Sequence, residues 1–173
     1  LLIAMEYNSL LPPHMVPAAT SGYEGFYHLN GMEGDVEMTK MHYLVRNHDW
    51  EAFQKQKSFL LEARDFLNRK HGEGTVEVEI TDTYYNMKEK IKDRMEVVEL
   101  AMEATKMAGL EPFIIPIRGG TDGAQLTYKG LLCPNLGTGG WNAHGRFECV
   151  TVEALEKCTE VLVNIVKLAS KKS

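Results

Sequence analysis

The 173-residue sequence predicts a mixed α/β fold. In the first half, segments with strand-like alternation and segments with helical periodicity follow one another in the order helix, strand, strand, helix, strand. With one further strand in front, that order becomes the split β-α-β arrangement of a ferredoxin-like layer. In the second half, two short apolar runs alternate with helical patterns across glycine-rich loops, which is typical of a piece of an α/β sheet.

The first three elements have separate signals. Residues 1–11 have a helical pattern that Pro12 stops. Residues 24–32 and 36–46 are interpreted as two strands joined at the EGD turn, where Gly34 can take a positive φ. The apolar residues of this helix include Leu2, Met5, Leu10 and Leu11. Because that helix has no strand before it, the chain is expected to begin inside a domain.

A longer helix and a third strand complete the first half. Asp49 is expected to cap a helix over residues 50–70, and Gly72 is expected to end it. Its predicted buried stripe consists of Phe53, Leu60, Ala63 and Leu67. Residues 76–80 alternate strictly between valine or isoleucine and glutamate, which predicts a strand with Val76, Val78 and Ile80 inward.

In the second half, an amphipathic helix is expected over residues 88–109, followed by a buried strand, PFIIPI, over residues 112–117. Asp122 is expected to cap a short helix, and LCPNL, over residues 132–136, predicts a second buried strand. A last helix is expected over residues 152–169, with its buried face formed by Leu155, Cys158, Leu162 and Ile165. Two strands are too few to close a core, so this half is expected to belong to a larger domain.

Composition excludes several classes of partner. There are 19 Lys and Arg against 24 Asp and Glu, which gives a net charge of -5 and argues against nucleic acid and anionic membranes. No apolar run approaches the roughly 20 residues that span a bilayer. Cys133, Cys149 and Cys158 form no metal-binding spacing and are expected to be reduced thiols. With no secretion signal in the opening residues, these features favour a cytoplasmic protein.

The candidate site begins at IRGGTDGAQL. Arg118 follows an apolar run at the edge where α/β sheets usually bind ligands, and its guanidinium suits a carboxylate or a carbonyl oxygen. Gly119 and Gly120 then lead into a helix N-terminus, where free amides favour an anion. The loop matches no nucleotide-binding motif, so a purely structural turn and an anion-binding loop both remain open.

Two further residues are candidates. His144 lies in GGWNAHGRFE, where neighbouring glycines leave room around its imidazole for a metal ion. Asn86 lies near the end of the last predicted strand of the first half, at a point suited to hydrogen bonding. Both residues also have ordinary structural interpretations, as a surface histidine and a turn asparagine. From the residues alone, the chain is a piece of an α/β cleft with a candidate anion site and one candidate metal ligand.

Four segments together, TSGYEGFYHL, DTYYNMKEK, PIRGGTDGAQL and CPNLGTGGWNAHGRFE, closely resemble the peptidase T family of tripeptide aminopeptidases. That family belongs to the di-zinc exopeptidases related to carboxypeptidase G and the aminoacylases. The resemblance implies an α+β lid of ferredoxin-like type over residues 1–87, missing its first strand. It implies that residues 88–173 are the C-terminal segment of a split catalytic domain.

The resemblance also implies roles for the candidate residues. His144 would be a zinc ligand, the only one that this chain supplies to a pair of zinc ions. Arg118, Asn86, Gly119 and Gly120 would contact the substrate, a tripeptide. The general base and the bridging aspartate would lie upstream of this chain, so no catalytic residue is assigned within it. The isolated chain is therefore expected to be inactive and to bind zinc weakly.

Two other classes of function stay open from the sequence. A non-catalytic ligand-binding or dimerisation module could use the first half, and the resemblance likewise allows a homodimer through the lid. A nucleic-acid-binding sheet would need its strand aromatics, such as Tyr27 and Tyr43, to stack on bases. The negative net charge and the absence of an RNA-binding motif argue against this last class.

Overall fold

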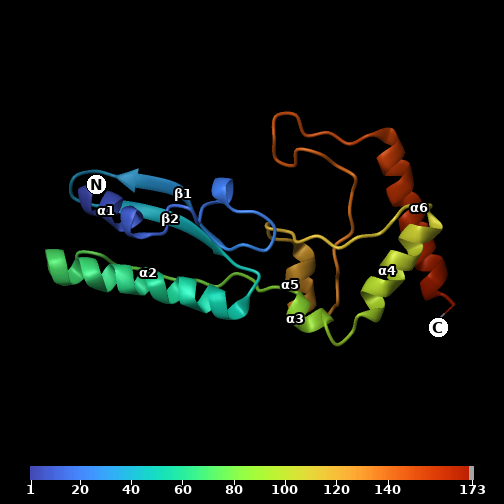
Figure 1. Cartoon of the computed structure of the whole chain (residues 1–173), viewed down its shortest axis with the longest axis horizontal. Helices are drawn as coiled ribbons and strands as arrows, with labels where there is room; N and C mark the ends of the chain where they lie inside the picture. The colour runs from blue at the N-terminus through green and yellow to red at the C-terminus, as the bar shows by residue number, and fades with distance from the viewer. Residues whose placement is uncertain (172–173) are drawn as a thin grey trace. The chain divides into compact units, whose positions relative to one another are not determined.

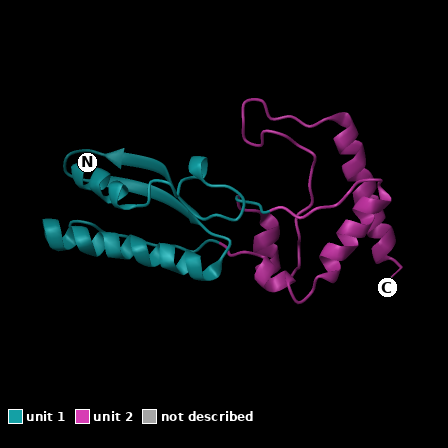
Figure 2. Ribbon diagram, in the orientation of Figure 1, with its two compact units in different colours: residues 1–83, 116–118 teal, residues 84–115, 119–173 magenta. Residues whose placement is uncertain are grey.

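The computed structural model describes residues 1–171 and divides the chain into two compact units (Figures 1 and 2). The first unit contains residues 1–83 together with residues 116–118. The second contains residues 84–115 and 119–173, of which the last two lie outside the described part. Helices and a small antiparallel sheet confirm the predicted α/β class. The assignment of residues 1–87 to a lid and 88–173 to a catalytic domain remains a prediction.

The first unit is a β-hairpin covered by helices (Figure 1). Its elements are α1 (Leu2–Leu10), the 3-10 turn η1 (Pro17–Ala19), β1 (Phe26–Gly34), β2 (Thr39–Arg46) and α2 (Trp50–His71). One buried cluster joins α1 and the chain after it, β1 and α2, and its members are Tyr7, Leu11, Tyr27, Leu60, Ala63 and Leu67. Leu67 is completely buried, so the centre of this core lies on α2.

The two predicted strands pair as a hairpin, but the turn lies at residues 35–38, later than predicted. β1 and β2 run antiparallel, with Phe26 opposite Arg46 and an irregularity between Leu29 and Gly31. Gly34 has a φ of 137°, and a Cβ at this position would lie 2.2 Å from the carbonyl oxygen of Met38. The turn therefore requires glycine at this position, as the sequence indicates.

α2 begins and ends where its capping residues predict. The Asp49 carboxylate accepts a hydrogen bond from the backbone N–H of Ala52 at 2.7 Å, which satisfies one of the free amides of the first turn. Gly72 ends the helix with a φ of 109°. Leu60 and Leu67 are buried as expected.

The bounds of α1 are close to those predicted, and only part of its apolar surface is buried. Leu2 is 82% exposed and Met5 is also exposed, whereas Tyr7 is buried and its hydroxyl donates to the carbonyl oxygen of Leu60 at 2.9 Å. The helix is apolar on most sides, so periodicity could not identify the buried face. The amphipathic Tyr7 packs inward because its hydroxyl finds an acceptor on α2.

The prediction of a third strand is wrong. Residues 76–80 are extended but form no sheet ladder, and the described part of the chain contains a sheet of two strands. Instead, the Asn68 side chain donates to the carbonyl oxygen of Val76 at 3.0 Å and accepts from its N–H at 2.8 Å. Val76 and Val78 still pack against the core, as the alternation predicts, whereas Ile80 is exposed.

The second unit contains α3 (Lys88–Ile91), α4 (Glu96–Met107), α5 (Asp122–Tyr128) and α6 (Val152–Ala169). α4 and α6 pack through a small cluster consisting of Ala104, Ala108, Val161 and Leu168. The Asn164 amide donates to the carbonyl oxygen of Ala104 at 3.3 Å within this contact. Small residues on α4 let the two helices approach closely.

Several predictions for this unit are wrong. The helix expected over residues 88–109 is interrupted between Ile91 and Glu96. The apolar runs at 112–117 and 132–136 are irregular rather than buried strands, and Phe113 is 78% exposed. A strand needs a neighbour to satisfy its backbone, and the described chain places none beside these runs.

The last helix has the predicted bounds and a different buried face. On α6, Val161, Asn164 and Leu168 are buried, while Leu155 and Leu162 are exposed. The residues of α6 are apolar over a wide arc. The spacing of its apolar residues therefore predicted a helix but not which side of it contacts α4. No described helix is long and apolar enough to cross a membrane.

Candidate functional site

Arg118 is the best-defined of the candidate residues. Its Nη1 donates to the carbonyl oxygen of Thr20, and its Nη2 donates to the Thr20 hydroxyl oxygen. The guanidinium carbon lies 4.7 Å from the centre of the Phe26 ring, a cation-π distance. All three residues belong to the first unit, so Arg118 is held by segments about a hundred residues earlier in the chain.

The charge of Arg118 has no carboxylate partner among the described residues. No carboxylate oxygen of the described residues lies within 4.0 Å of a guanidinium nitrogen of Arg118. Its Nε is buried and has no hydrogen-bond partner in the described part of the chain. Buried donors in folded proteins are almost always paired, so a positive group with a spare buried N–H suits an anionic or carbonyl acceptor.

The pKa of His48 depends on the charge of Arg118. Burial first, and then the positive charge of Arg118, lower the pKa of the His48 imidazole below its ordinary value of 6.5. The Tyr23 ring meets the His48 ring edge-on, with 5.2 Å between their centres. The cation of Arg118 is therefore close enough to affect the titration of a neighbouring histidine.

The glycines after Arg118 have steric roles in the second unit. A Cβ on Gly120 would lie 2.6 Å from the hydroxyl oxygen of Tyr84, so this position accepts only glycine without rearrangement. Gly119 has open space around it. The helix that follows is capped by Thr121, whose side chain accepts from the N–H of Ala124 at 3.3 Å.

The predicted cap at Asp122 is thus one residue too late. Asp122 occupies the first turn of α5, where a carboxylate is also favourable. Thr121 is the cap because its extended backbone places its hydroxyl oxygen near the free N–H of Ala124. The binding of an anion by this loop remains a prediction.

Asn86 makes local contacts in the second unit. Its side-chain oxygen accepts from the N–H of Lys88 at 3.0 Å, at the start of α3. Its carbonyl oxygen accepts from the Tyr128 hydroxyl, also at 3.0 Å. These bonds hold the segment before α3 against α5. A substrate contact for Asn86 remains a prediction.

His144 lies at the tip of a small loop closed by Trp141 and Cys149, whose backbones exchange hydrogen bonds of 2.8 and 3.1 Å. It has a φ of 65°, a conformation that residues other than glycine adopt infrequently. Its N–H donates to the Glu148 carboxylate at 3.0 Å, which helps to hold this backbone. The imidazole belongs to an exposed residue and is accessible to a ligand.

The described residues do not fit a zinc pair. Within residues 1–171, no group of three or more His, Cys, Asp or Glu side chains is arranged to hold a metal ion. A tight zinc site needs about four donors, and a catalytic one about three protein donors. His144 can contribute one imidazole, and this chain alone does not supply the rest.

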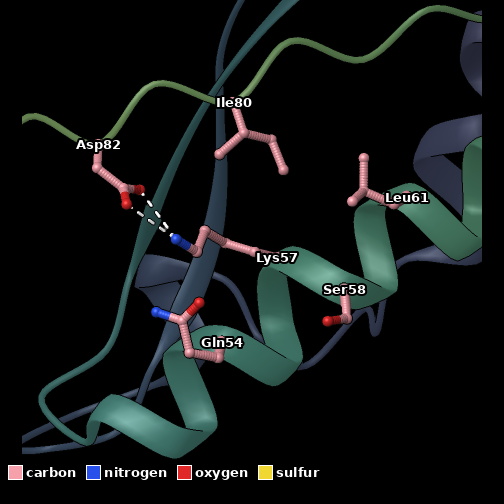
Figure 3. Close-up of a pocket in the computed structure, with 6 residues that line it drawn as sticks. All are labelled: Gln54, Lys57, Ser58, Leu61, Ile80 and Asp82. Carbon is pink, nitrogen blue, oxygen red and sulfur yellow. Dashed lines mark hydrogen bonds and ion pairs between the residues drawn. The ribbon is translucent and has the colours of Figure 1, made fainter.

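A separate hollow lies in the first unit between α2 and the chain at Ile80 and Asp82 (Figure 3). It has a volume of about 360 Å³. The Lys57 ammonium binds both carboxylate oxygens of Asp82, at 2.9 and 3.1 Å. This ion pair, absent from the sequence predictions, satisfies the charges at the hollow and ties the extended segment to α2.

The sequence analysis also missed Thr20, Phe26 and His48 as neighbours of Arg118. The segment TSGYEGFYHL predicts part of a strand and contributes to the family resemblance, but neither signal points to Arg118. No local periodicity or spacing could have joined Thr20 to Arg118, because the contact spans 98 residues.

No protein-family model matches the chain. It is 50% identical over 172 residues to a protein named peptidase T from Caldanaerobacter subterraneus subsp. tengcongensis, covering 99% of this chain and 42% of the relative. It is 51% identical over 169 residues to peptidase T from Alkaliphilus oremlandii, covering 98% of this chain and 41% of that protein. The resemblance inferred from the four motifs is confirmed.

Among solved structures, the chain is similar to aminopeptidase PepT from Bacillus cereus ATCC 10987, with a TM-score of 0.66 and 24% identity. The match covers 95% of this chain and 43% of that one, and it supports the fold. The chain therefore spans about two fifths of the length of the relatives it matches.

Proposed function

We propose that this chain, which is related over nearly its whole length to proteins named peptidase T, is the C-terminal part of a zinc-dependent tripeptide aminopeptidase. The complete enzyme releases the N-terminal residue of tripeptides. The observation that carries the proposal is identity of about half the residues across 99% of the chain. This identity extends through both units, so the similarity includes the sequence of the chain as well as its fold.

Within that enzyme, the residues of this chain bind substrate. Arg118 presents an uncompensated guanidinium, half-buried over Phe26, that can form paired hydrogen bonds with the terminal carboxylate of a tripeptide. Asn86, Gly119 and Gly120 contribute contacts to the peptide backbone. A zinc site completed by the remainder of the enzyme would supply Lewis-acid chemistry. His144 supplies one imidazole toward the metal, with the other ligands and the general base provided by the remainder of the enzyme.

The proposal includes a cytoplasmic location and a homodimer formed through the first unit. Three free cysteines are consistent with a reducing compartment. The exposed strand edge of the β1–β2 hairpin offers backbone groups to a second copy. Neither nucleic acid nor membrane is a partner in this proposal, because a net charge of -5 disfavours binding to polyanions.

A chimeric enzyme tests the function directly. The 173 residues replace the matching two fifths of Caldanaerobacter peptidase T, and release of the N-terminal residue from a tripeptide is followed by chromatography. We expect the chimera to cleave tripeptides and the isolated chain to be inactive. The parent Caldanaerobacter protein is the positive control.

The alternative, a non-catalytic ligand-binding or dimerisation module, makes the opposite prediction for the chimera. A chimera that is folded by circular dichroism and still inactive, beside an active parent, would favour that alternative. Turnover by the isolated chain that a chelator abolishes would contradict the division of the site between this chain and the rest of the enzyme.

A further inference from the structure

The contact between Thr20 and Arg118 has an unusual construction. The Thr20 hydroxyl donates its hydrogen to the carbonyl oxygen of Val16 at 2.8 Å. Having one hydrogen to donate, the hydroxyl can only accept from Arg118, and it does so from Nη2. The Thr20 carbonyl accepts from Nη1. One residue therefore binds both terminal nitrogens of the guanidinium with neutral acceptors.

The segment that carries Thr20 is preorganised. Val16 and Thr20 flank η1, where Pro17 restricts the backbone, and the N–H of Ala19 donates to the Val16 carbonyl at 3.0 Å. Beneath the guanidinium, Phe26 is buried and forms a fixed floor. Thr20 thus sets the rotation of the guanidinium within its plane, and Phe26 sets the plane itself.

Neutral acceptors orient the guanidinium without cancelling its charge. A carboxylate in the place of Thr20 would compete with an anionic ligand, whereas a hydroxyl and a carbonyl leave the positive charge available. The remaining donors of Arg118, including the buried and unpartnered Nε, are left for another acceptor.

We propose that Thr20 is a positioning residue that orients Arg118 to bind a carboxylate ligand. The carboxylate belongs to the tripeptide, and this part of the proposal rests on the proposed function. The orienting role itself can be tested without catalysis, through His48, whose imidazole senses the charge of Arg118.

The first experiment uses the 173-residue chain and follows the His48 ring protons by NMR as a function of pH. Arg118→Gln removes the charge, so the pKa of His48 should rise toward 6.5. Thr20→Val keeps the shape and removes the hydroxyl, and the pKa should rise in the same direction by a smaller amount. Thr20→Ser retains the acceptor and should match the wild-type protein.

Thr39→Val is the matched control. The Thr39 hydroxyl also donates to a carbonyl oxygen four residues earlier, that of Asp35 at 3.2 Å, and it lies in the same unit with no arginine contact. This variant should leave the pKa of His48 unchanged. If Thr20→Val also leaves it unchanged while Arg118→Gln raises it, Thr20 does not hold the guanidinium and the proposal is overturned. If His48 does not respond to Arg118→Gln, the guanidinium is not at this place and the proposal is likewise overturned.

The second experiment uses the active chimera and a pair of substrates, a tripeptide and its C-terminal amide. Thr20→Val should raise KM for the free acid about tenfold and change kcat little, with the amide nearly unaffected. Thr20→Ser should restore the wild-type KM. Equal losses on acid and amide would show a merely structural role. An inactive parent chimera would refute the proposed function, while the His48 titration would still decide the role of Thr20.

Should Thr20→Val fail to fold, the titration is carried out with Thr20→Ala, which also removes the hydroxyl acceptor. The His48 pKa should again rise, because a less restrained guanidinium spends less time beside the imidazole. A pKa identical to that of the wild-type protein, while Arg118→Gln raises it, would overturn the proposal.

Discussion

The hydroxyl of Tyr7 in α1 donates to the carbonyl oxygen of Leu60 in α2 across 53 residues of sequence, at 2.9 Å. Both residues are buried, and the bond joins the two helices that cover the hairpin. Burial also raises the pKa of the Tyr7 phenol far above its ordinary value, so the hydroxyl stays a donor at any moderate pH.

Tyr7→Phe tests this bond. The variant keeps the ring and removes the donor, and we expect it to lower the free energy of unfolding by about 1 kcal/mol. Urea denaturation checks the value. Tyr43→Phe is the control, because the Tyr43 hydroxyl bonds to the side chain of Asn8 at an exposed position and its loss should cost less. A larger loss in the control would contradict the assignment of Tyr7 to the core.

Stability should fall on acidification in two separate windows. His48 has a pKa lowered below 6.5, so its neutral form is favoured by folding. That contribution is fully present above 6.5 and is lost as pH falls through the lower folded pKa. Glu6, whose pKa is lowered from 4.5 chiefly by Lys70 and then by His71, acts only in the more acidic window.

Urea unfolding between about pH 7.5 and pH 5.5 isolates the His48 window. The wild-type chain should lose stability across this range, and His48→Gln should show a flatter dependence. Glu6→Gln should flatten the dependence at lower pH. Parallel curves for wild type and His48→Gln would exclude His48 as the titrating group.

In the proposed tripeptide aminopeptidase, Arg118→Lys should affect free-acid and amide substrates differently. Lysine offers a point charge in place of two parallel donors, so kcat/KM for free-acid tripeptides should fall by roughly thirtyfold, on the order of 2 kcal/mol. Tripeptide amides should lose much less. The measurement is steady-state kinetics on matched acid and amide pairs, and comparable losses on both would rule out a carboxylate anchor.

Zinc binding to the isolated chain should be weak. His144 provides one imidazole and the described residues provide no cluster of three donors, so most coordination positions fall to water. Isothermal titration should detect no tight stoichiometric site, and His144→Ala should behave like the wild-type chain. A tight site that disappears with His144→Ala would mean that this chain holds metal by itself.

The first unit should be the more protected against hydrogen exchange. Its core joins two helices to the hairpin, whereas the second unit has a smaller cluster between α4 and α6 and exposes Phe113 and Ile114. Mass spectrometry of exchanged peptides should show slow amides around Leu67 and faster ones after residue 88. The reverse order would contradict this ranking. Exposed apolar residues in the second unit should also promote self-association at high concentration.

Local signals predicted the elements whose causes are local. The cap at Asp49, the glycine at position 34 and the bounds of α6 all depend on contacts within a few residues, so the sequence was sufficient to locate them. The family resemblance likewise depended on the order of motifs along the chain. His144 and Arg118 were candidates from their local sequence, the glycines around His144 and the apolar run before Arg118.

Tertiary structure decided what depends on distant partners. Residues 76–80 have the composition of a strand, yet Asn68 occupies the hydrogen bonds of Val76 and no ladder forms. The buried face of α6 was misassigned in part, because a helix apolar around most of its circumference does not reveal which side meets a neighbour.

By itself, the sequence determined the α/β class, the helix ends that carry caps, and the relationship to peptidase T. Only the tertiary structure brought Thr20, Phe26 and His48 to Arg118. The reason is physical. Periodicity and capping report energies between residues a few positions apart, whereas the orientation of a guanidinium depends on acceptors and rings that reach it only when the chain has folded.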